Sequence, residues 1–62
     1  MRMIDLETKR GSYRVAVGVV AVTPIGGQMI SRACWDDENG HHEIEGVEAV
    51  LPRVVKMIEE GN

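Results

Sequence analysis

A run of small and β-branched residues from Tyr13 to Thr23 dominates the first half of the sequence. Such residues favour extended backbone. Pro24 to Gly27 has the composition of a hairpin loop, and Gln28 to Trp35 resumes the alternation of an extended chain. We therefore predict two long antiparallel strands at the centre of a sheet. Gly18, in the middle of the strand from Tyr13 to Thr23, predicts a bulge or the close approach of another part of the backbone.

Shorter segments on either side predict the outer strands. Residues Arg2 to Glu7 place Ile4 and Leu6 on one side, which is the period-two pattern of a half-buried strand. The polar stretch from Asp36 to His42 contains an Asn-Gly pair typical of a turn. After it, His41 to Glu45 predicts a short fourth strand.

The last sixteen residues have helical rather than strand periodicity. Pro52 lacks an amide proton and is tolerated only in the first turn or at a kink, so the helix is expected to begin near residues 48–50. Gly61 stands where a C-terminal cap is expected. The apolar positions that define the stripe are Val47, Val50, Leu51, Val54, Val55 and Ile58.

These elements predict a single α+β domain over residues 1–62. Its three- to four-stranded antiparallel meander is followed by one C-terminal amphipathic helix, which packs on one face and makes two layers. The central strand 13–23 carries valines on both sides near its end, so the uncovered face is expected to be apolar. An uncovered apolar face usually marks an interface, and we expect a homodimer.

Size and cysteine content limit how such a domain is stabilised. A chain of 62 residues buries only about 60% of the surface that its unfolded form exposes. Cys34 is the only cysteine, so no internal disulfide forms; we expect a buried thiol, a reducing compartment and a cytoplasmic location. No apolar run approaches the ~18 residues of a membrane-spanning helix, and no membrane partner is expected.

Charge is distributed unevenly along the chain. Residues 1–35 hold five basic and two acidic side chains, whereas residues 36–62 hold eight acidic and two basic ones. We predict a non-enzymatic macromolecule-binding protein, a protein-interaction module or an inhibitor of the anti-defence type that phages encode, acting through an acidic loop and the apolar sheet face. Trp35 and Arg32 are the expected anchors, because both residue types are favoured at interfaces. The acidic loop comprises Asp36, Asp37, Glu38, Glu43 and Glu45.

An alternative function is nucleic-acid binding or antitoxin-like regulation. Lys9, Arg10 and Arg14 form a basic cluster at the first hairpin, and Tyr13 between them offers a stacking surface. The net charge of −3 opposes this function, since nucleic-acid modules normally present a basic field over a whole face.

A metal-dependent hydrolase is a third hypothesis. His41 and His42 stand among acidic residues, so imidazole and carboxylate ligands are available. Adjacent histidines on a strand point to opposite faces, however, and no catalytic spacing joins the nucleophiles and bases. We therefore predict no catalytic residues, metal ligands, cofactor or small-molecule substrate.

The order of three antiparallel strands and a helix resembles the partial ribonuclease-H-type fold of small antitoxin domains. The likeness lies in the architecture alone. Those sequences have a Pro-Gly-rich region before the helix that this chain lacks, so the resemblance implies a fold and no function.

Overall fold

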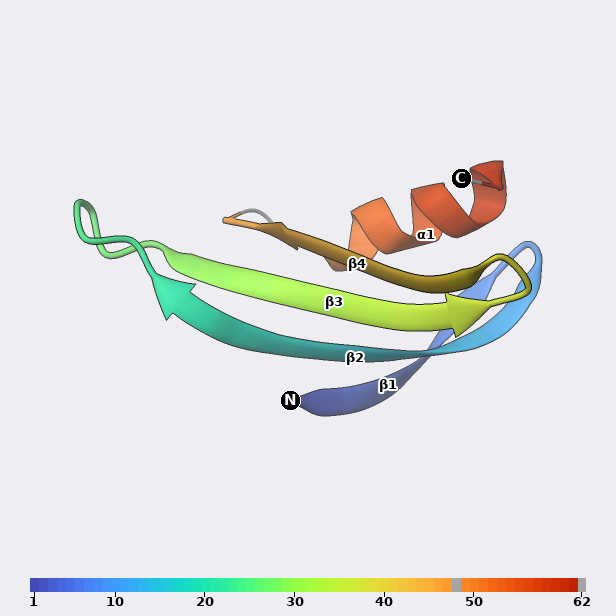
Figure 1. The fold of residues 1–62 in the computed structure, drawn as a ribbon. Coiled ribbons are helices and arrows are strands. Elements are labelled where there is room, and N and C mark those ends of the chain that lie inside the picture. Colours follow the sequence, from blue (N-terminus) through green and yellow to red (C-terminus); the bar gives the residue numbers. More distant parts are fainter. Residues whose placement is uncertain (48, 62) are drawn as a thin grey trace.

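A computed structural model describes residues 1–47 and 49–61. In that part of the chain, four strands precede one helix: β1 (Arg2–Thr8), β2 (Gly11–Val22), β3 (Met29–Asp37), β4 (Gly40–Gly46) and α1 (Leu51–Glu60). The strands form one antiparallel sheet in the order β1-β2-β3-β4, with α1 packed on one face (Figure 1). The predicted α+β meander with a C-terminal helix is confirmed.

The turns explain why neighbouring strands pair in sequence order. At the β3–β4 turn the Asn39 N–H donates to Asp37 Oδ1 at 2.7 Å, and Gly40 has a φ of 114°. That φ is accessible to glycine and strained for other residues, so the turn is specified locally. The short fourth strand predicted over His41 to Glu45 is confirmed as β4.

The helix begins later and ends where the sequence predicts. Pro52 occupies its first turn, because a helix starting several residues earlier would need the N–H that proline lacks. At the other end Gly61 adopts a left-handed φ of 76°, and its N–H donates to the Ile58 carbonyl at 3.2 Å. Among the described residues, no helix is long and apolar enough to span a membrane.

The core lies between α1 and the sheet. Val54 and Ile58 point from the helix onto Val15 of β2 and Trp35 of β3, and Trp35 is only 2% exposed. Burying one aliphatic side chain such as Val54 or Ile58 stabilises a fold by about 1.5–3 kcal/mol. Half-buried neighbours extend this cluster: Ile4, Leu6, Tyr13, Val17, Ile44 and Met57.

The face of the sheet opposite α1 differs from the prediction. Instead of a continuous apolar surface, most cross-strand neighbours there are charged or polar: Asp5 stands opposite Arg14, Arg32 opposite Glu45 and Asp36 opposite His41. Met3 opposite Ala16 is an apolar exception. The expectation of an apolar open face is therefore wrong where the four strands lie side by side. The physical reason is that β2 becomes apolar on both sides only in its last residues.

Those last residues lie outside the four-stranded region. β1 accompanies β2 only as far as Val17, and β4 accompanies β3 only from Ser31 onward. The β2–β3 hairpin therefore projects beyond both outer strands and the helix (Figure 1), and the molecule measures 38 × 20 × 18 Å. A bulge interrupts the pairing between Val19 and Ala21.

Gly18 marks the root of this projection. A Cβ at Gly18 would stand 3.0 Å from Met1 Cγ and 3.3 Å from Met1 Cα. The close backbone approach predicted at this glycine is thus present, and the first residue of the chain provides it.

Candidate functional site

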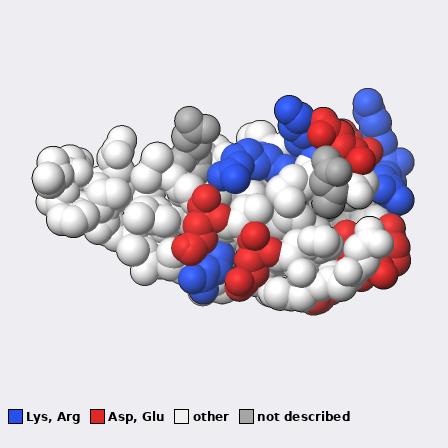
Figure 2. Space-filling view, turned by 45° about the horizontal axis from the view of Figure 1, so that its top comes forward, with Lys and Arg blue, Asp and Glu red and all other residues white. Residues whose placement is uncertain are grey.

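The projecting end of the β2–β3 hairpin carries a concentrated apolar surface. Val22 is 57% exposed, Ile25 90% and Met29 61%. No charged residue occurs in the sequence between Arg14 and Arg32, and this end of the molecule is free of charged side chains in Figure 2. We call the surface formed by Val19, Val20, Val22, Ile25 and Met29 the hairpin end.

A hollow lies at the root of the hairpin end. Its volume is about 310 Å³, and Leu51 at the start of α1 forms one wall. Val19 belongs both to this hollow and to the hairpin end, so the two surfaces are continuous. The remaining lining residues are Arg2, Ile4, Val17, Gly18 and Ser31.

Charged pairs cover much of the open sheet face. Arg14 Nε lies 3.3 Å from Asp5 Oδ1, and Arg32 Nη2 lies 3.4 Å from Glu45 Oε2. Both pairs connect directly opposed residues on adjacent strands. Exposed pairs of this kind contribute little stability, at most about 1 kcal/mol each.

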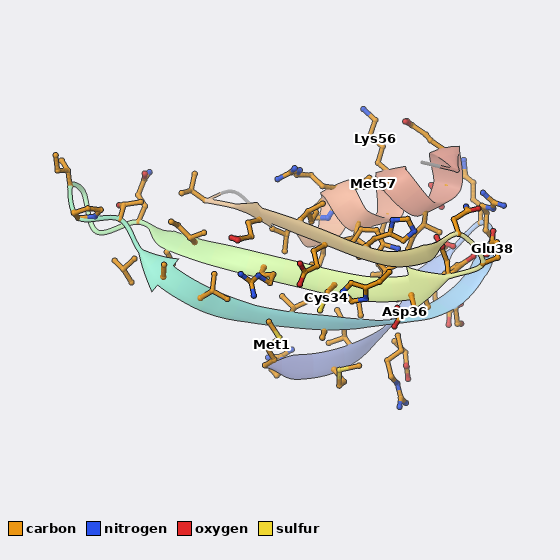
Figure 3. All side chains as sticks on the ribbon, in the orientation of Figure 1. Met1, Cys34, Asp36, Glu38, Lys56 and Met57 are labelled. Atoms are coloured by element: carbon orange, nitrogen blue, oxygen red, sulfur yellow. The ribbon has the colours of Figure 1, made fainter. Side chains whose placement is uncertain are left out.

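A second polar group on the open face contains an imidazole, two carboxylates and a thiol. His41 Nδ1 lies 2.9 Å from Asp36 Oδ1, and His41 Nε2 lies 3.9 Å from Glu43 Oε1. Cys34 stands opposite Glu43 in the strand register, and its half-buried thiol joins the same group. Cys34 and Asp36 are neighbours on one face of β3 (Figure 3). Cys34 was expected in the core; it lies on the opposite face because it is out of phase with Ala33 and Trp35.

The other histidine belongs to the helix side of the sheet. His42 stacks on Trp35, with ring centroids 5.3 Å apart and planes inclined by 24°. Its Nε2 lies 2.9 Å from Asp37 Oδ1. The hydrogen bond from His42 holds the pKa of the Asp37 carboxyl below its ordinary value; burial acts in the opposite direction, and the Asn39 N–H reinforces the lowering.

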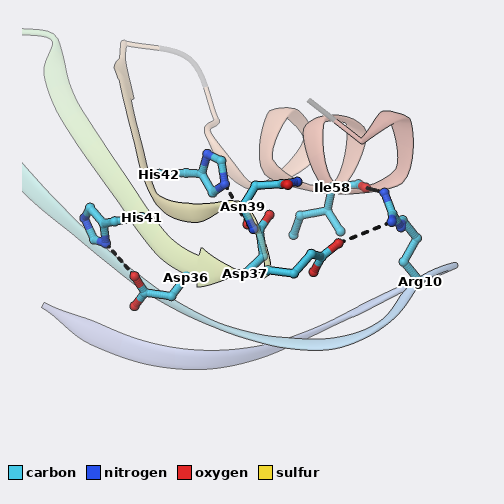
Figure 4. A network of polar contacts seen from close by, with 8 residues as sticks. Arg10, Asp36, Asp37, Asn39, His41, His42 and Ile58 are labelled. Atoms are coloured by element: carbon cyan, nitrogen blue, oxygen red, sulfur yellow. Dashed lines mark hydrogen bonds and ion pairs between the residues drawn. The ribbon is translucent and has the colours of Figure 1, made fainter.

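The acidic residues predicted to form one loop surface are divided between two faces. Asp36, Glu43 and Glu45 lie on the open face, whereas the Asp37 side chain is only 10% exposed beside His42. Glu38, at the turn, pairs with Arg10 at 3.3 Å. Figure 4 shows His41 and His42 directed to opposite sides of β4, as the alternation of a strand requires.

The two predicted anchors also separate. The Trp35 ring is buried in the core, so its assignment as a partner contact needs correction: Trp35 shares the helix-covered face of β3 with Ala33. Arg32 lies on the open face, half-buried and paired with Glu45.

The basic residues of the first hairpin do not converge. Arg10 reaches the C-terminal end of α1, where it donates to the Ile58 carbonyl at 3.4 Å and pairs with Glu38. Arg14 lies on the open face with Asp5, and the Lys9 backbone N–H donates to Glu59 at 2.8 Å. Arg10 and Arg14 thus pair with carboxylates, and the Glu59 carboxylate lies at the Lys9 backbone, which reduces the field available to a phosphate backbone.

Comparison of the chain with protein-family models, with curated proteins and with solved structures gave no match. The geometry of the chain itself is therefore the basis for any functional assignment.

Proposed function

We propose that this chain is a small protein-binding module whose contact surface is the hairpin end. The observation that supports it most directly is the gathering of Val22, Ile25 and Met29, each more than half exposed, on one charge-free projection. Large contiguous apolar patches on proteins of this size usually serve as interaction sites. This proposal replaces the acidic loop and the open face as the principal contact.

The first partner we propose is a second copy of the chain. Beyond Val17 on β2 and before Ser31 on β3, no outer strand pairs with the hairpin in the described part of the chain. Unpaired strand edges favour the addition of another strand, and the exposed side chains on both faces would be buried at the same time. Covering such surface contributes about 25 cal/mol for each Å² removed from water.

Light scattering coupled to size exclusion over a dilution series tests this proposal. We expect a dimer in the wild type, and a monomer in the double variant Val22→Lys/Met29→Lys. Met3→Lys is the matched control, because Met3 is 58% exposed and Val22 57%, yet Met3 lies on the outer strand β1. The control should retain the wild-type mass.

Two results would contradict the proposal that the hairpin end binds a second copy of the chain. A wild-type monomer at every concentration would exclude a second copy as the occupant. Equal dissociation of the dimer by Met3→Lys and by the double variant would place the interface outside the hairpin end.

A further inference from the structure

Three metal-ligating side chains converge on the open face of the sheet. The thiol of Cys34, the imidazole of His41 and the carboxylate of Glu43 offer ligand atoms that all lie within 4.8 Å of one another. Metal–ligand lengths for zinc are about 2.3 Å to sulfur and about 2.0–2.2 Å to nitrogen or oxygen, so ligands of one ion lie up to about 4 Å apart. Small side-chain rotations therefore suffice to enclose an ion.

The strand register explains this convergence. Cys34 on β3 stands directly opposite Glu43 on β4, and His41 lies two residues before Glu43 on the same strand. The period of two places His41 and Glu43 on one face, beside Cys34. Backbone pairing thus fixes the three Cα positions, and only the side-chain torsions need to adjust.

Asp36 provides an independent indication of metal binding. Its Oδ1 lies 2.9 Å from His41 Nδ1, and a carboxylate at this position accepts a hydrogen bond from Nδ1–H. It therefore favours the neutral tautomer whose Nε2 lone pair can bind a metal ion. That Nε2 is the atom nearer to Glu43, at 3.9 Å. A carboxylate behind a histidine ligand is the usual device that fixes its tautomer and orientation in zinc sites.

We propose that Cys34, His41 and Glu43 bind one Zn²⁺ ion, with Asp36 as the positioning residue for His41. A donor set of one sulfur, one nitrogen and one oxygen favours zinc over calcium or magnesium, which take oxygen ligands. Three protein ligands leave one tetrahedral position for water. His41 and Glu43 are exposed, so the ion enters from solvent, and binding releases the Cys34 thiol proton.

Titration of the full reduced chain with Co²⁺ and with Zn²⁺ tests the site. We expect one Co²⁺ per chain with a thiolate-to-cobalt charge-transfer band, which Zn²⁺ displaces. Cys34→Ser should abolish the band, and His41→Ala should reduce affinity strongly. His42→Gln is the matched control: it alters the adjacent histidine on the opposite face and should leave the affinity unchanged. Circular dichroism without metal verifies that each variant is folded.

Asp36→Asn separates a positioning role from simple attraction between charges. Loss of an outer carboxylate behind a histidine ligand typically weakens metal binding 10–100-fold. Glu45→Gln removes a negative charge from the same face at a residue that pairs with Arg32. This variant should change the affinity for metal much less than Asp36→Asn does. Equal losses in these two variants, absence of the charge-transfer band in the wild type, or binding that survives Cys34→Ser and His41→Ala would overturn the proposal.

Discussion

The carboxylate of Asp37 accepts a hydrogen bond from His42 Nε2 at 2.9 Å beside the ring of Trp35, on the helix-covered face of the sheet. Asp36, the preceding residue, binds the other histidine on the open face. The turn between β3 and β4 thus sends two Asp–His pairs to opposite sides. One pair supports the core, and the other belongs to the proposed metal site.

The Asp37–His42 pair predicts a specific dependence of stability on pH. The pKa of Asp37 is lowered in the folded chain, so below the ordinary aspartate pKa of about 3.9 the unfolded chain binds the proton more readily. The free energy of unfolding should therefore fall as pH drops through about 4 and below. Asp37→Asn should flatten this decline.

Urea unfolding at several pH values, followed by the fluorescence of Trp35, measures the effect. Trp35 is buried and is the only tryptophan in the sequence, so its emission reports loss of the core. Asp36→Asn removes a neighbouring exposed carboxylate and serves as the control. Equal flattening in both variants would contradict the assignment to Asp37.

The helix–sheet core predicts unequal costs for two similar truncations. Val54 is fully buried, so Val54→Ala removes two buried carbons and leaves a cavity, with an expected loss of about 2–3 kcal/mol. Val22→Ala alters a 57% exposed residue of the hairpin end and should cost less than about 0.5 kcal/mol in the monomer. Urea midpoints at low protein concentration compare the two; similar losses would place Val22 in an unrecognised core.

Replacing each of two arginines on the first hairpin by alanine should lower the stability of the fold by different amounts. Arg10 contacts both Glu38 and the Ile58 carbonyl near the C-terminal end of α1. A cation there interacts favourably with the negative end of the helix dipole. Arg10→Ala should cost about 1 kcal/mol. Within residues 1–47 and 49–61, Arg14 forms an ion pair only with Asp5, and both side chains are 69% exposed, so Arg14→Ala should cost at most about 0.5 kcal/mol. Thermal unfolding with the reverse order of costs would contradict this.

Local sequence patterns predicted the architecture well. Apolar and polar side chains alternate with a period of two in the strands, apolar side chains recur at helical spacing in α1, and Gly61 ends the helix. These signals are local because backbone propensity and capping depend on a few neighbouring residues. Even the short β4 was predictable, since the Asn39-Gly40 turn returns the chain beside β3.

Which side chains are exposed was predicted less well, because their exposure depends on which face of the sheet the helix covers. Alternation placed Trp35 on one side of β3 and Cys34 on the other, yet it could not tell which side α1 would cover. The sequence alone therefore predicts Trp35 as an anchor and Cys34 as a core residue, the reverse of where the two side chains lie. The Cys34–Glu43 opposition follows only from the register of β3 and β4, which is not a local property.

The cap at Gly61 supports a last prediction, in which two effects can be separated. At a φ of 76° an alanine would be strained by about 1 kcal/mol, and its Cβ would approach Arg10 Nη1 to 3.1 Å. Gly27 has a comparable φ of 62° with no atom within 4 Å of a Cβ. Gly27→Ala thus measures the backbone strain alone, and Gly61→Ala adds displacement of Arg10 from Ile58. Thermal unfolding should show a larger loss for Gly61→Ala, and in the Arg10→Ala background the excess should vanish. An excess that persists without Arg10 would mean that the helix end itself, and not its contact with the first hairpin, requires glycine.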